Sequence, residues 1–362
     1  MSLRIIQTSD IHLGAPFLFL KDKSTLHGKR VISAFKSSID YAIKSKADVF
    51  FIVGDLFHTP FPDKYVQQIV IDELTRLSES GIKTLLLPGN HDHVEGGIFD
   101  DIKFLARLPD EVMLLDIKGI EGVKIEELGI RVYSQTVFEN IFDFDILQDD
   151  LINIALIHAS VDIGKGSERK ISLERMKSWN FKYIALGDWH GFLEVDKNIY
   201  YSGSPEILNS DQDGAGFILD VLIEEKGVLV KKIKVGEIAS VKLEIDISKF
   251  SSLDLLLSHL KEKGNDNTIA NIELKGLRSL DLLLDIERVE NYLEDFYYHL
   301  NIKDMTLFKL SDAELDDLSN DMLIGSYVEF LKTKKESGEI SDAVYEQAIQ
   351  VGVNLLKGNN AN

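Results

Sequence analysis

Short apolar runs that end in polar turns recur along the first part of the chain. The clearest is Val49–Val53, five consecutive apolar residues that are typical of a strand buried on both faces, and Asp55 follows it. Leu3–Thr8 and Lys83–Leu87 are similar runs, and each also leads into a polar turn. Gly54 lets the chain turn sharply, so the Asp55 carboxylate can face the space beyond the end of its strand.

The segments between these predicted strands carry apolar residues at helical spacing. Residues 24–46 and about 64–80 therefore predict two helices, each of which returns the chain to the next strand. Strands that alternate with helices favour an α/β arrangement around a parallel sheet. From Val112 to Gln135 the pattern changes to short strands separated by glycine turns, which predicts a second sheet packed against the first. The expected fold class is α/β, a two-sheet sandwich flanked by helices.

The pattern changes again near Gly236, where a small α+β module is predicted and interpreted as a cap domain. Its predicted elements are a strand at 242–247, a helix at 253–263, a strand at 268–275, a mostly helical stretch at 280–300 and a strand at 305–310. Beyond Asp312, two apolar stripes at helical spacing predict a helical tail that either packs on the cap domain or docks a partner. We therefore divide the chain into residues 1–236, 237–311 and 312–362.

The composition limits which metal ligands and which substrates the protein can use. The 362 residues include no cysteine, which excludes disulfides and thiolate metal ligands, so any metal must be held by His, Asp, Asn or similar side chains. No apolar run approaches the length of a membrane span and no signal peptide is evident, so we expect a cytoplasmic protein without a membrane partner. The net charge of −20 means that a DNA substrate would need metal ions, a local basic patch or a partner to attract it.

Side chains that can bind metal follow five predicted strands, two of which are the later apolar runs at 153–157 and 182–186. These side chains are Asp10, His12, Asp55, Asn90, His158, Asp188 and His190. Seven oxygen or nitrogen ligands are too many for one cation and suit two, with water completing each shell. A bridging carboxylate is then required, and we choose Asp55 because it ends a central buried strand. Two cations that share a hydroxide are a standard means of in-line attack on a phosphate ester, so these residues predict a phosphoesterase.

The order of these motifs resembles that of the calcineurin-like metallophosphoesterase superfamily. The likeness covers about residues 1–235 and rests on Asp-Ile-His-Leu-Gly at 10–14, Gly-Asp-Leu-Phe-His at 54–58, Gly-Asn-His-Asp at 89–92, His158 and Gly-Asp-Trp-His at 187–190. Within the superfamily, the first two motifs resemble those of the SbcD-type DNA repair exonucleases. The nuclease domain of those exonucleases is also followed by a small cap domain. The resemblance to them therefore extends, less closely, to about residue 310.

The resemblance implies a metal-dependent DNA exonuclease that processes DNA ends, with two divalent cations, Mn²⁺ being favoured and Mg²⁺ the alternative. It implies two ligand sets that share Asp55, namely Asp10, His12, Asp55 and His190 for one cation and Asp55, Asn90, His158 and Asp188 for the other. It places His91 beside the scissile phosphate as a catalytic residue, with His58 supporting it. It also implies an SbcC-type ATPase as a partner, for which the two C-terminal helices would be the docking site. A homodimer is a further possibility that the resemblance does not decide.

One position departs from the SbcD pattern. Where those nucleases have Gly-His-x-His, this chain has Gly187-Asp188-Trp189-His190, so a carboxylate replaces an imidazole. The harder oxygen donor favours Mn²⁺ or Mg²⁺. Two other functions remain open: a phosphoesterase for small molecules or phosphoproteins, which the acidic charge favours, and a metal-bound scaffold for a partner ATPase. The complete ligand set together with His91 argues against the scaffold.

Overall fold

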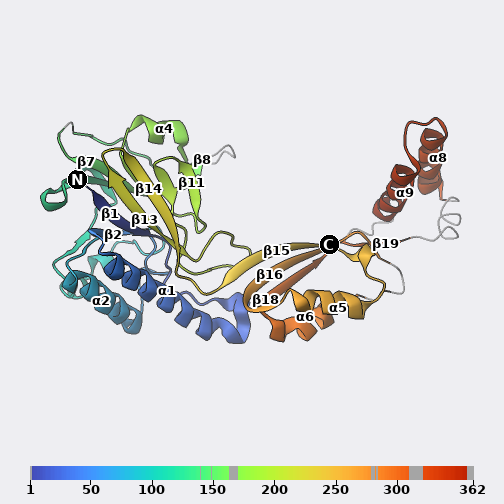
Figure 1. Cartoon of the computed structure of the whole chain (residues 1–362), viewed down its shortest axis with the longest axis horizontal. Helices are drawn as coiled ribbons and strands as arrows, with labels where there is room; N and C mark the ends of the chain where they lie inside the picture. The colour runs from blue at the N-terminus through green and yellow to red at the C-terminus, as the bar shows by residue number, and fades with distance from the viewer. Residues whose placement is uncertain are drawn as a thin grey trace. The chain divides into compact units, whose positions relative to one another are not determined.

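The computed structural model describes residues 2–138, 140–147, 149–162, 170–278, 282, 284–309 and 321–356. Contacts within the chain divide it into two compact units, Met1–Ser240 and Val241–Asn362, and each is described by itself (Figure 1). The domain boundaries that we expect at residues 236 and 311 stay a prediction. In the described part of the chain, no helix has the length and apolar character that a membrane crossing requires.

The first sheet of the N-terminal unit has six strands in the order β14-β13-β1-β2-β3-β4. They are β1 (Leu3–Thr8), β2 (Val49–Val53), β3 (Lys83–Leu87), β4 (Val112–Leu114), β13 (Phe217–Glu224) and β14 (Gly227–Lys234). Strands β1 to β4 pair in parallel, and Ile52 lies opposite both Thr8 and Leu86. The carboxyl ends of β1, β2 and β3 are therefore level, and the residues that follow them emerge at one edge of the sheet.

The second sheet has the order β11-β12-β10-β7-β6-β5. Its strands are β5 (Lys118–Ile125), β6 (Ile130–Thr136), β7 (Ile152–His158), β10 (Tyr183–Gly187), β11 (Leu193–Asp196) and β12 (Ile199–Tyr201). Strands β6, β7 and β10 are parallel, and His158 lies opposite both Thr136 and Gly187. The ends of β7 and β10 are therefore level as well. Shorter elements of this unit are β8 (Val161–Asp162), β9 (Ile171–Ser172) and α3 (Ile102–Leu105).

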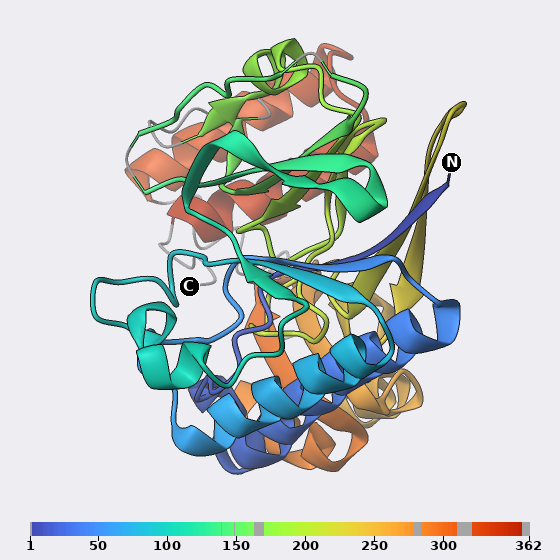
Figure 2. The ribbon, with the colours of Figure 1, turned by 90° about the vertical axis from the view of Figure 1, so that its left-hand side faces the viewer.

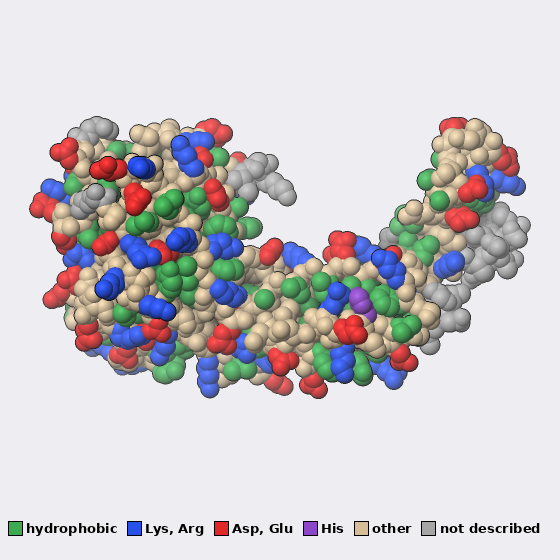
Figure 3. All heavy atoms as spheres, in the orientation of Figure 1, with side chains coloured by type: hydrophobic (Ala, Val, Ile, Leu, Met, Phe, Trp, Pro, Cys, Tyr) green, Lys and Arg blue, Asp and Glu red, His purple; other side chains and the backbone are tan. Residues whose placement is uncertain are grey.

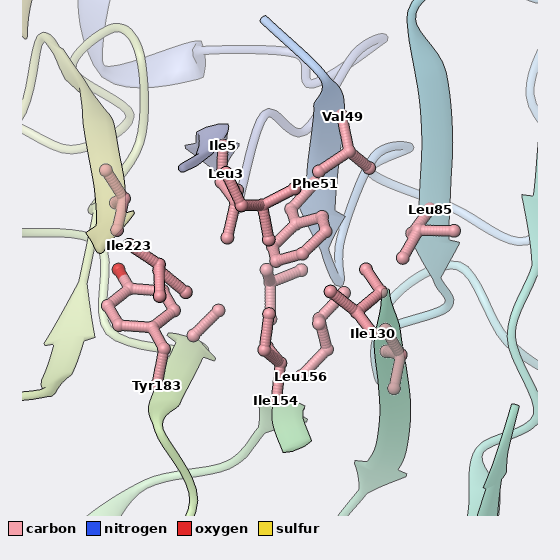
Figure 4. Close-up of a cluster of buried hydrophobic side chains, with 14 of the residues drawn as sticks. Leu3, Ile5, Val49, Phe51, Leu85, Ile130, Ile154, Leu156, Tyr183 and Ile223 are labelled. Carbon is pink, nitrogen blue, oxygen red and sulfur yellow. The ribbon is translucent and has the colours of Figure 1, made fainter. Parts of the chain in front are cut away.

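The two sheets pack face to face on a shared apolar core (Figure 4). Phe51 and Leu85 come from the first sheet, and Ile154, Leu156 and Tyr183 come from the second. None of these five side chains is more than 1% exposed. Burial of a side chain of this size contributes about 1.5–3 kcal/mol relative to exposure. The core therefore fixes the strand ends of one sheet relative to those of the other.

Helices cover the outer faces of the sandwich (Figure 2). Helices α1 (Ser24–Ser45) and α2 (Lys64–Glu79) lie along the first sheet, and α4 (Leu173–Ser178) lies beyond the second. Helix α2 begins after Asp63, whose carboxylate accepts a hydrogen bond of 2.9 Å from the Val66 N–H. The predicted α/β sandwich of two sheets flanked by helices is confirmed.

The C-terminal unit contains a three-stranded sheet in the order β15-β16-β18. Its elements are β15 (Ala239–Asp246), α5 (Leu253–Glu262), β16 (Asn265–Lys275), β17 (Leu277–Arg278), α6 (Ile286–Leu293), β18 (Tyr297–Asp304) and β19 (Leu307–Phe308). The helical stretch predicted at 280–300 is confirmed over 286–296, where α6 is followed by a 3₁₀ turn, and it is wrong beyond that point, because a strand begins at Tyr297. That strand pairs in parallel with β16 and buries Tyr297 and Ile302 in the core of the unit, so sheet pairing overrides the helical spacing.

The predicted helical tail is present as two helices, α8 (Met322–Glu336) and α9 (Asp342–Leu356). Their shared apolar contact consists of Ile324, Leu331, Ile349 and Val353. The side-chain amide of Asn354 donates a hydrogen bond of 2.9 Å to the Phe308 carbonyl oxygen, which attaches α9 to β19. The helical pair therefore has its own small core, and Asn354 provides a polar attachment to β19 of the same unit.

Candidate metal centre

The turns after β1, β2 and β3 are joined by backbone hydrogen bonds. The Asp10 N–H donates to the Gly54 carbonyl oxygen at 3.1 Å, and the His12 N–H donates to that of Asp55 at 3.0 Å. The Gly54 N–H donates to the Leu87 carbonyl oxygen at 3.0 Å. These bonds continue the strand pairing into the turns, so the side chains that the turns carry are held as rigidly as the sheet itself.

Four of the predicted ligands adopt the left-handed backbone conformation that L-residues rarely occupy. The φ angles are 51° at Asp10, 51° at His12, 52° at Asp55 and 94° at Asp188. Such conformations cost about 1–3 kcal/mol each and persist where the surrounding structure imposes them, as functional sites often do. The strain turns these side chains away from the sheets and toward the space beyond the strand ends.

Asp55 lies at the centre of the cluster. Its Oδ2 is 3.5 Å from His12 Nε2 and 3.4 Å from His158 Nε2. Its Oδ1 accepts a hydrogen bond of 2.9 Å from the His91 N–H. One carboxylate therefore connects the turns after β1, β2 and β3 with the end of β7.

His158 ends a strand of the second sheet and is oriented by contacts with residues of the first sheet and of the turn after β3. Its Nδ1 lies 3.0 Å from the Val53 carbonyl oxygen, and its Nε2 lies 2.9 Å from Asn90 Oδ1. A carbonyl oxygen at Nδ1 favours the tautomer whose Nε2 is free to bind a metal ion. The close packing of His158 against Val53 requires glycine at position 187, because a Cβ there would lie 1.9 Å from the Val53 carbonyl oxygen.

Among the described His, Asp and Glu side chains, three groups bring one ligand atom each within 4.8 Å of one another. They are Asp10–His12–His190, Asp10–Asp55–His158 and His12–His58–His91. Five of these seven residues lie in the turns after β1, β2 and β3, whereas His158 ends β7 and His190 follows β10. All seven belong to the N-terminal unit. The assignment of each ligand to one or the other of two cations stays a prediction.

Asp188 is outside these three groups and lies beside them. Its backbone N–H donates to the Asp10 carboxylate at 3.0 Å and its own carboxylate accepts a hydrogen bond from the Ser160 hydroxyl. The structure therefore places Asp188 in contact with the centre through its backbone, while its side chain is engaged by Ser160. Its predicted role as a ligand stays a prediction.

Burial and neighbouring charges shift the pKa values of the cluster in opposite directions. Burial, together with the Asp55 and Asp188 charges, raises the pKa of Asp10 to about 7. Burial lowers the pKa of His12 to about 3. Burial opposes ionisation of Asp55 and His158 too, yet their mutual attraction lowers the pKa of Asp55 and raises the pKa of His158 to about 10. Buried carboxylates in this cluster are therefore stable in their ionised form only when a positive charge lies beside them.

The residues fit a divalent cation. His12 Nε2 is buried without a hydrogen-bond partner in the described residues, and it faces the Asp55 carboxylate. An unpaired buried nitrogen costs about 1–3 kcal/mol, a cost that coordination of a cation would remove. Carboxylate oxygens suit Mn²⁺ and Mg²⁺, and imidazole nitrogens suit transition metals, so this mixed set of donors favours a divalent transition metal such as Mn²⁺ over Mg²⁺.

We expect cation binding to this centre to release protons at pH 7. In the metal-free protein His158 holds a proton, because its pKa is about 10, and Asp10 is about half protonated. The dissociation constant should therefore fall about tenfold per pH unit for each proton displaced as the pH rises from 6 to 8. Isothermal titration calorimetry in buffers of different ionisation enthalpy measures this release, and an affinity independent of pH would contradict it.

The two predicted catalytic histidines lie side by side at the edge of the centre. The rings of His58 and His91 stack with their centroids 5.5 Å apart, and the His91 ring lies edge-on to that of His12 at 4.7 Å. His58 Nδ1 is 3.3 Å from His12 Nδ1. His91 is exposed whereas His12 is buried, so His91 faces the side from which a substrate can enter.

Two residues outside the predicted ligand set support the centre, Asp92 of the Gly-Asn-His-Asp motif and Ser160, and the contacts that they make were not predicted from the sequence. The buried Asp92 carboxylate accepts hydrogen bonds from the Gly89 N–H at 2.7 Å and the Phe57 N–H at 3.1 Å, and so joins the turns after β3 and β2. Ser160 orients Asp188. Asp92 follows His91 in the chain, and this position beside a predicted catalytic residue indicated a role at the site. The inward direction of the Asp92 side chain, however, depends on how the turn folds.

The fold and the centre together define a metal-dependent phosphodiesterase. The chain belongs to the calcineurin-like phosphoesterase family, because the profile of that family matches residues 3–192, more than half of the chain. The superfamily predicted from the motifs is thereby confirmed. The match includes the turns that carry all seven predicted metal ligands.

Individual relatives are similar at low identity. The DNA double-strand break repair protein Mre11 of Sulfolobus acidocaldarius is 24% identical over 394 aligned residues, which cover 98% of each chain. That of Sulfurisphaera tokodaii is 27% identical over 281 residues, covering 72% of this chain and 67% of the relative. Among solved structures, the calcineurin-like phosphoesterase YfkN from Bacillus subtilis aligns with a TM-score of 0.40 at 14% identity, over 65% of this chain and 91% of that one.

Proposed function

We propose that this protein is a DNA exonuclease that hydrolyses phosphodiester bonds at DNA ends during repair. The observation that carries the proposal is the convergence of two ligand groups, which share Asp10, around the Asp55 carboxylate. Two neighbouring groups of this kind suit two divalent cations, of which we favour Mn²⁺. The relatives named as DNA double-strand break repair proteins favour DNA over a small molecule as the substrate.

The proposed ligand sets are those expected from the motifs, with Asp10, His12, Asp55 and His190 for one cation and Asp55, Asn90, His158 and Asp188 for the other. Two divalent cations supply Lewis-acid activation of water and neutralise charge that develops on the phosphate. The protein's part is to hold the donors in place. The contact of His158 with the Val53 carbonyl oxygen and the hydrogen bond from the His91 N–H to Asp55 serve this purpose.

His91 is proposed as the residue that stabilises or protonates the leaving oxygen. Its backbone is attached to Asp55, and its exposed ring lies edge-on to the buried His12. Histidine suits this task because its ordinary pKa is close to neutral pH. His58, stacked on His91, is proposed to hold the ring in position.

A local group of lysines offers contacts for the DNA backbone despite the net charge of −20. Strand β14 carries Lys231, Lys232 and Lys234. Figure 3 shows Lys and Arg side chains gathered on the part of the N-terminal unit where β13 and β14 lie in Figure 1. Such contacts with phosphate bind DNA without reading its sequence, as an exonuclease requires.

The test is degradation of end-labelled linear DNA in Mn²⁺, with closed circular DNA and bis(p-nitrophenyl) phosphate alongside. We expect loss of the labelled ends while the circular DNA remains intact. Cleavage of the small diester alone, even with a candidate ATPase present, would favour the small-molecule phosphoesterase. Cleavage of none of the three, with cations bound, would favour the scaffold.

A partner ATPase of the SbcC type is proposed to dock on the helical pair α8–α9. Met322, Leu323 and Phe330 on α8 are 90%, 63% and 57% exposed, although the same helix buries Ile324 and Leu331. Exposed apolar side chains on a helix that already has a buried face are typical of a protein interface.

We expect Leu323→Glu with Phe330→Glu to abolish binding of the ATPase and to leave hydrolysis of bis(p-nitrophenyl) phosphate unchanged. Burying two charges at an apolar contact costs several kcal/mol, whereas the metal centre belongs to the other unit. Lys332→Glu, an exposed position on the same helix, is the matched control. Size-exclusion chromatography with the purified ATPase measures the binding, and a complex that survives the double substitution would contradict this docking site.

A further inference from the structure

Trp189 is exposed and stands in the chain between two predicted metal ligands, Asp188 and His190. Its side chain is 57% accessible, whereas Trp179, the other tryptophan, is 6% accessible and packs against Phe144 and Phe181. Among the described residues, no aromatic ring stacks on the Trp189 indole and no acceptor bonds to its N–H. A large aromatic surface is therefore presented to solvent at the residue between Asp188 and His190.

The backbone around Trp189 is held on both sides. The Asp188 N–H donates to the Asp10 carboxylate at 3.0 Å. The His190 carbonyl oxygen accepts hydrogen bonds from the Ser204 N–H at 2.9 Å and from the Gln212 side-chain amide at 2.7 Å. The indole is thus carried by a fixed turn, which lowers the entropy lost when a flat ligand stacks on it.

The edge of the indole lies close to the following glycine. A Cβ at position 191 would lie 3.2 Å from the Trp189 Nε1 and 2.3 Å from the Asp213 carbonyl oxygen. Glycine at this position therefore leaves room for the ring beside the backbone. The ring rests on the turn by its nitrogen edge, and more than half of its surface remains available for contact.

We propose that Trp189 is a stacking platform for the nucleobase next to the scissile phosphate, a specificity residue that selects DNA ends carrying a base. The proposal rests on the proposed nuclease function. Consecutive Cα atoms are about 3.8 Å apart, so the Trp189 backbone adjoins both Asp188 and His190. The proposal is that the long indole side chain extends from this position to a nucleotide whose phosphate lies at the centre. Stacking on an aromatic ring tolerates every base, because each base has a π face.

The experiment compares two single-stranded oligonucleotides that differ only at the terminal nucleotide, one with a base and one with an abasic tetrahydrofuran. Single-turnover hydrolysis in Mn²⁺ is measured for the wild type, Trp189→Ala and Trp189→Phe. Phe61→Ala is the control, since Phe61 is an even more exposed ring, at 68%, and is not flanked by predicted ligands. In parallel, tryptophan fluorescence is recorded in Mg²⁺ with phosphorothioate-ended versions of both oligonucleotides.

At an enzyme concentration below saturation, we expect the wild type and Phe61→Ala to hydrolyse the end with a base about 5- to 100-fold faster than the abasic end, because the base adds binding energy by stacking. Trp189→Ala should lose this preference, and Trp189→Phe should keep most of it. Fluorescence should be quenched by the oligonucleotide with the terminal base and much less by the abasic one. An unchanged preference in Trp189→Ala would overturn the proposal, as would fluorescence that responds equally to the two oligonucleotides.

The two proposals fail in different ways. If DNA ends are degraded but the terminal base makes no difference, stacking by Trp189 is wrong and the nuclease function stands. If the wild type hydrolyses neither oligonucleotide while the base still quenches the fluorescence, the nuclease function is wrong and base stacking stands.

Discussion

Replacing Asp55 with Asn is expected to reduce metal-dependent hydrolysis by about a thousandfold or more, which corresponds to about 4 kcal/mol of lost transition-state stabilisation. One Asp55 oxygen lies within 3.5 Å of both His12 Nε2 and His158 Nε2, so this carboxylate connects the two ligand groups. An amide carries no negative charge, and its single oxygen cannot both face the two histidines and accept the hydrogen bond from the His91 N–H, so the cations would be held more weakly and less well placed. The measurements are single-turnover rates on DNA ends and metal stoichiometry by equilibrium dialysis.

Asp220→Asn is the matched control for this substitution. Asp220 is another buried carboxylate of the N-terminal unit, at 4% exposure, and it pairs with Arg4 at 2.8 Å on the first sheet. Its loss should reduce the free energy of unfolding but leave the rate of hydrolysis of the folded protein unchanged. If Asp55→Asn were no more harmful to hydrolysis than Asp220→Asn, the central role of Asp55 would be wrong.

Replacing His91 with Ala is expected to reduce the rate of hydrolysis by about 10²- to 10⁴-fold while both cations remain bound. The His91 ring lies at the exposed edge of the centre, stacked on His58 and edge-on to His12. Its loss removes a proton donor for the leaving oxygen. Its backbone N–H, which holds Asp55, is retained in the alanine variant.

His93→Ala is the control for His91, because His93 lies on the same turn and its ring contacts Phe138 at 5.8 Å instead of the metal centre. Metal stoichiometry is the decisive second measurement. The group His12–His58–His91 could itself hold a cation. Loss of one bound cation in His91→Ala would show that His91 is a ligand, and the catalytic role proposed for it would then be wrong.

The strands that carry the centre could be predicted almost to the residue. The runs predicted at 3–8, 49–53 and 83–87 coincide with β1, β2 and β3. An uninterrupted apolar run that ends at glycine or a polar turn is a local signal, and burial on both faces of a central strand does not alter it. The segment 297–304 lacked such a signal. It becomes a strand because β16 offers it a pairing edge, which its own sequence cannot specify.

The candidate residues could be named from the sequence as well, since carboxylates and imidazoles after parallel strands must emerge at the same edge of a sheet. The arrangement of these residues in space could not be predicted from the sequence. The contact of His158 with the Val53 carbonyl oxygen joins residues 105 positions apart, and the left-handed conformation of Asp55 follows from the pairing of two turns. The engagement of Asp188 by Ser160 also became evident from the folded chain.

The sequence by itself determined the strand-helix alternation, the chemical types of the ligands and their delivery to one edge, because these depend on periodicity and on residue chemistry within each segment. Tertiary structure alone decided which ligands converge, which pKa values rise or fall, and that Trp189 is left exposed beside the centre. These properties depend on distances between side chains from different strands and on the loss of solvent around them. Such distances exist only once the two sheets have packed on their common core.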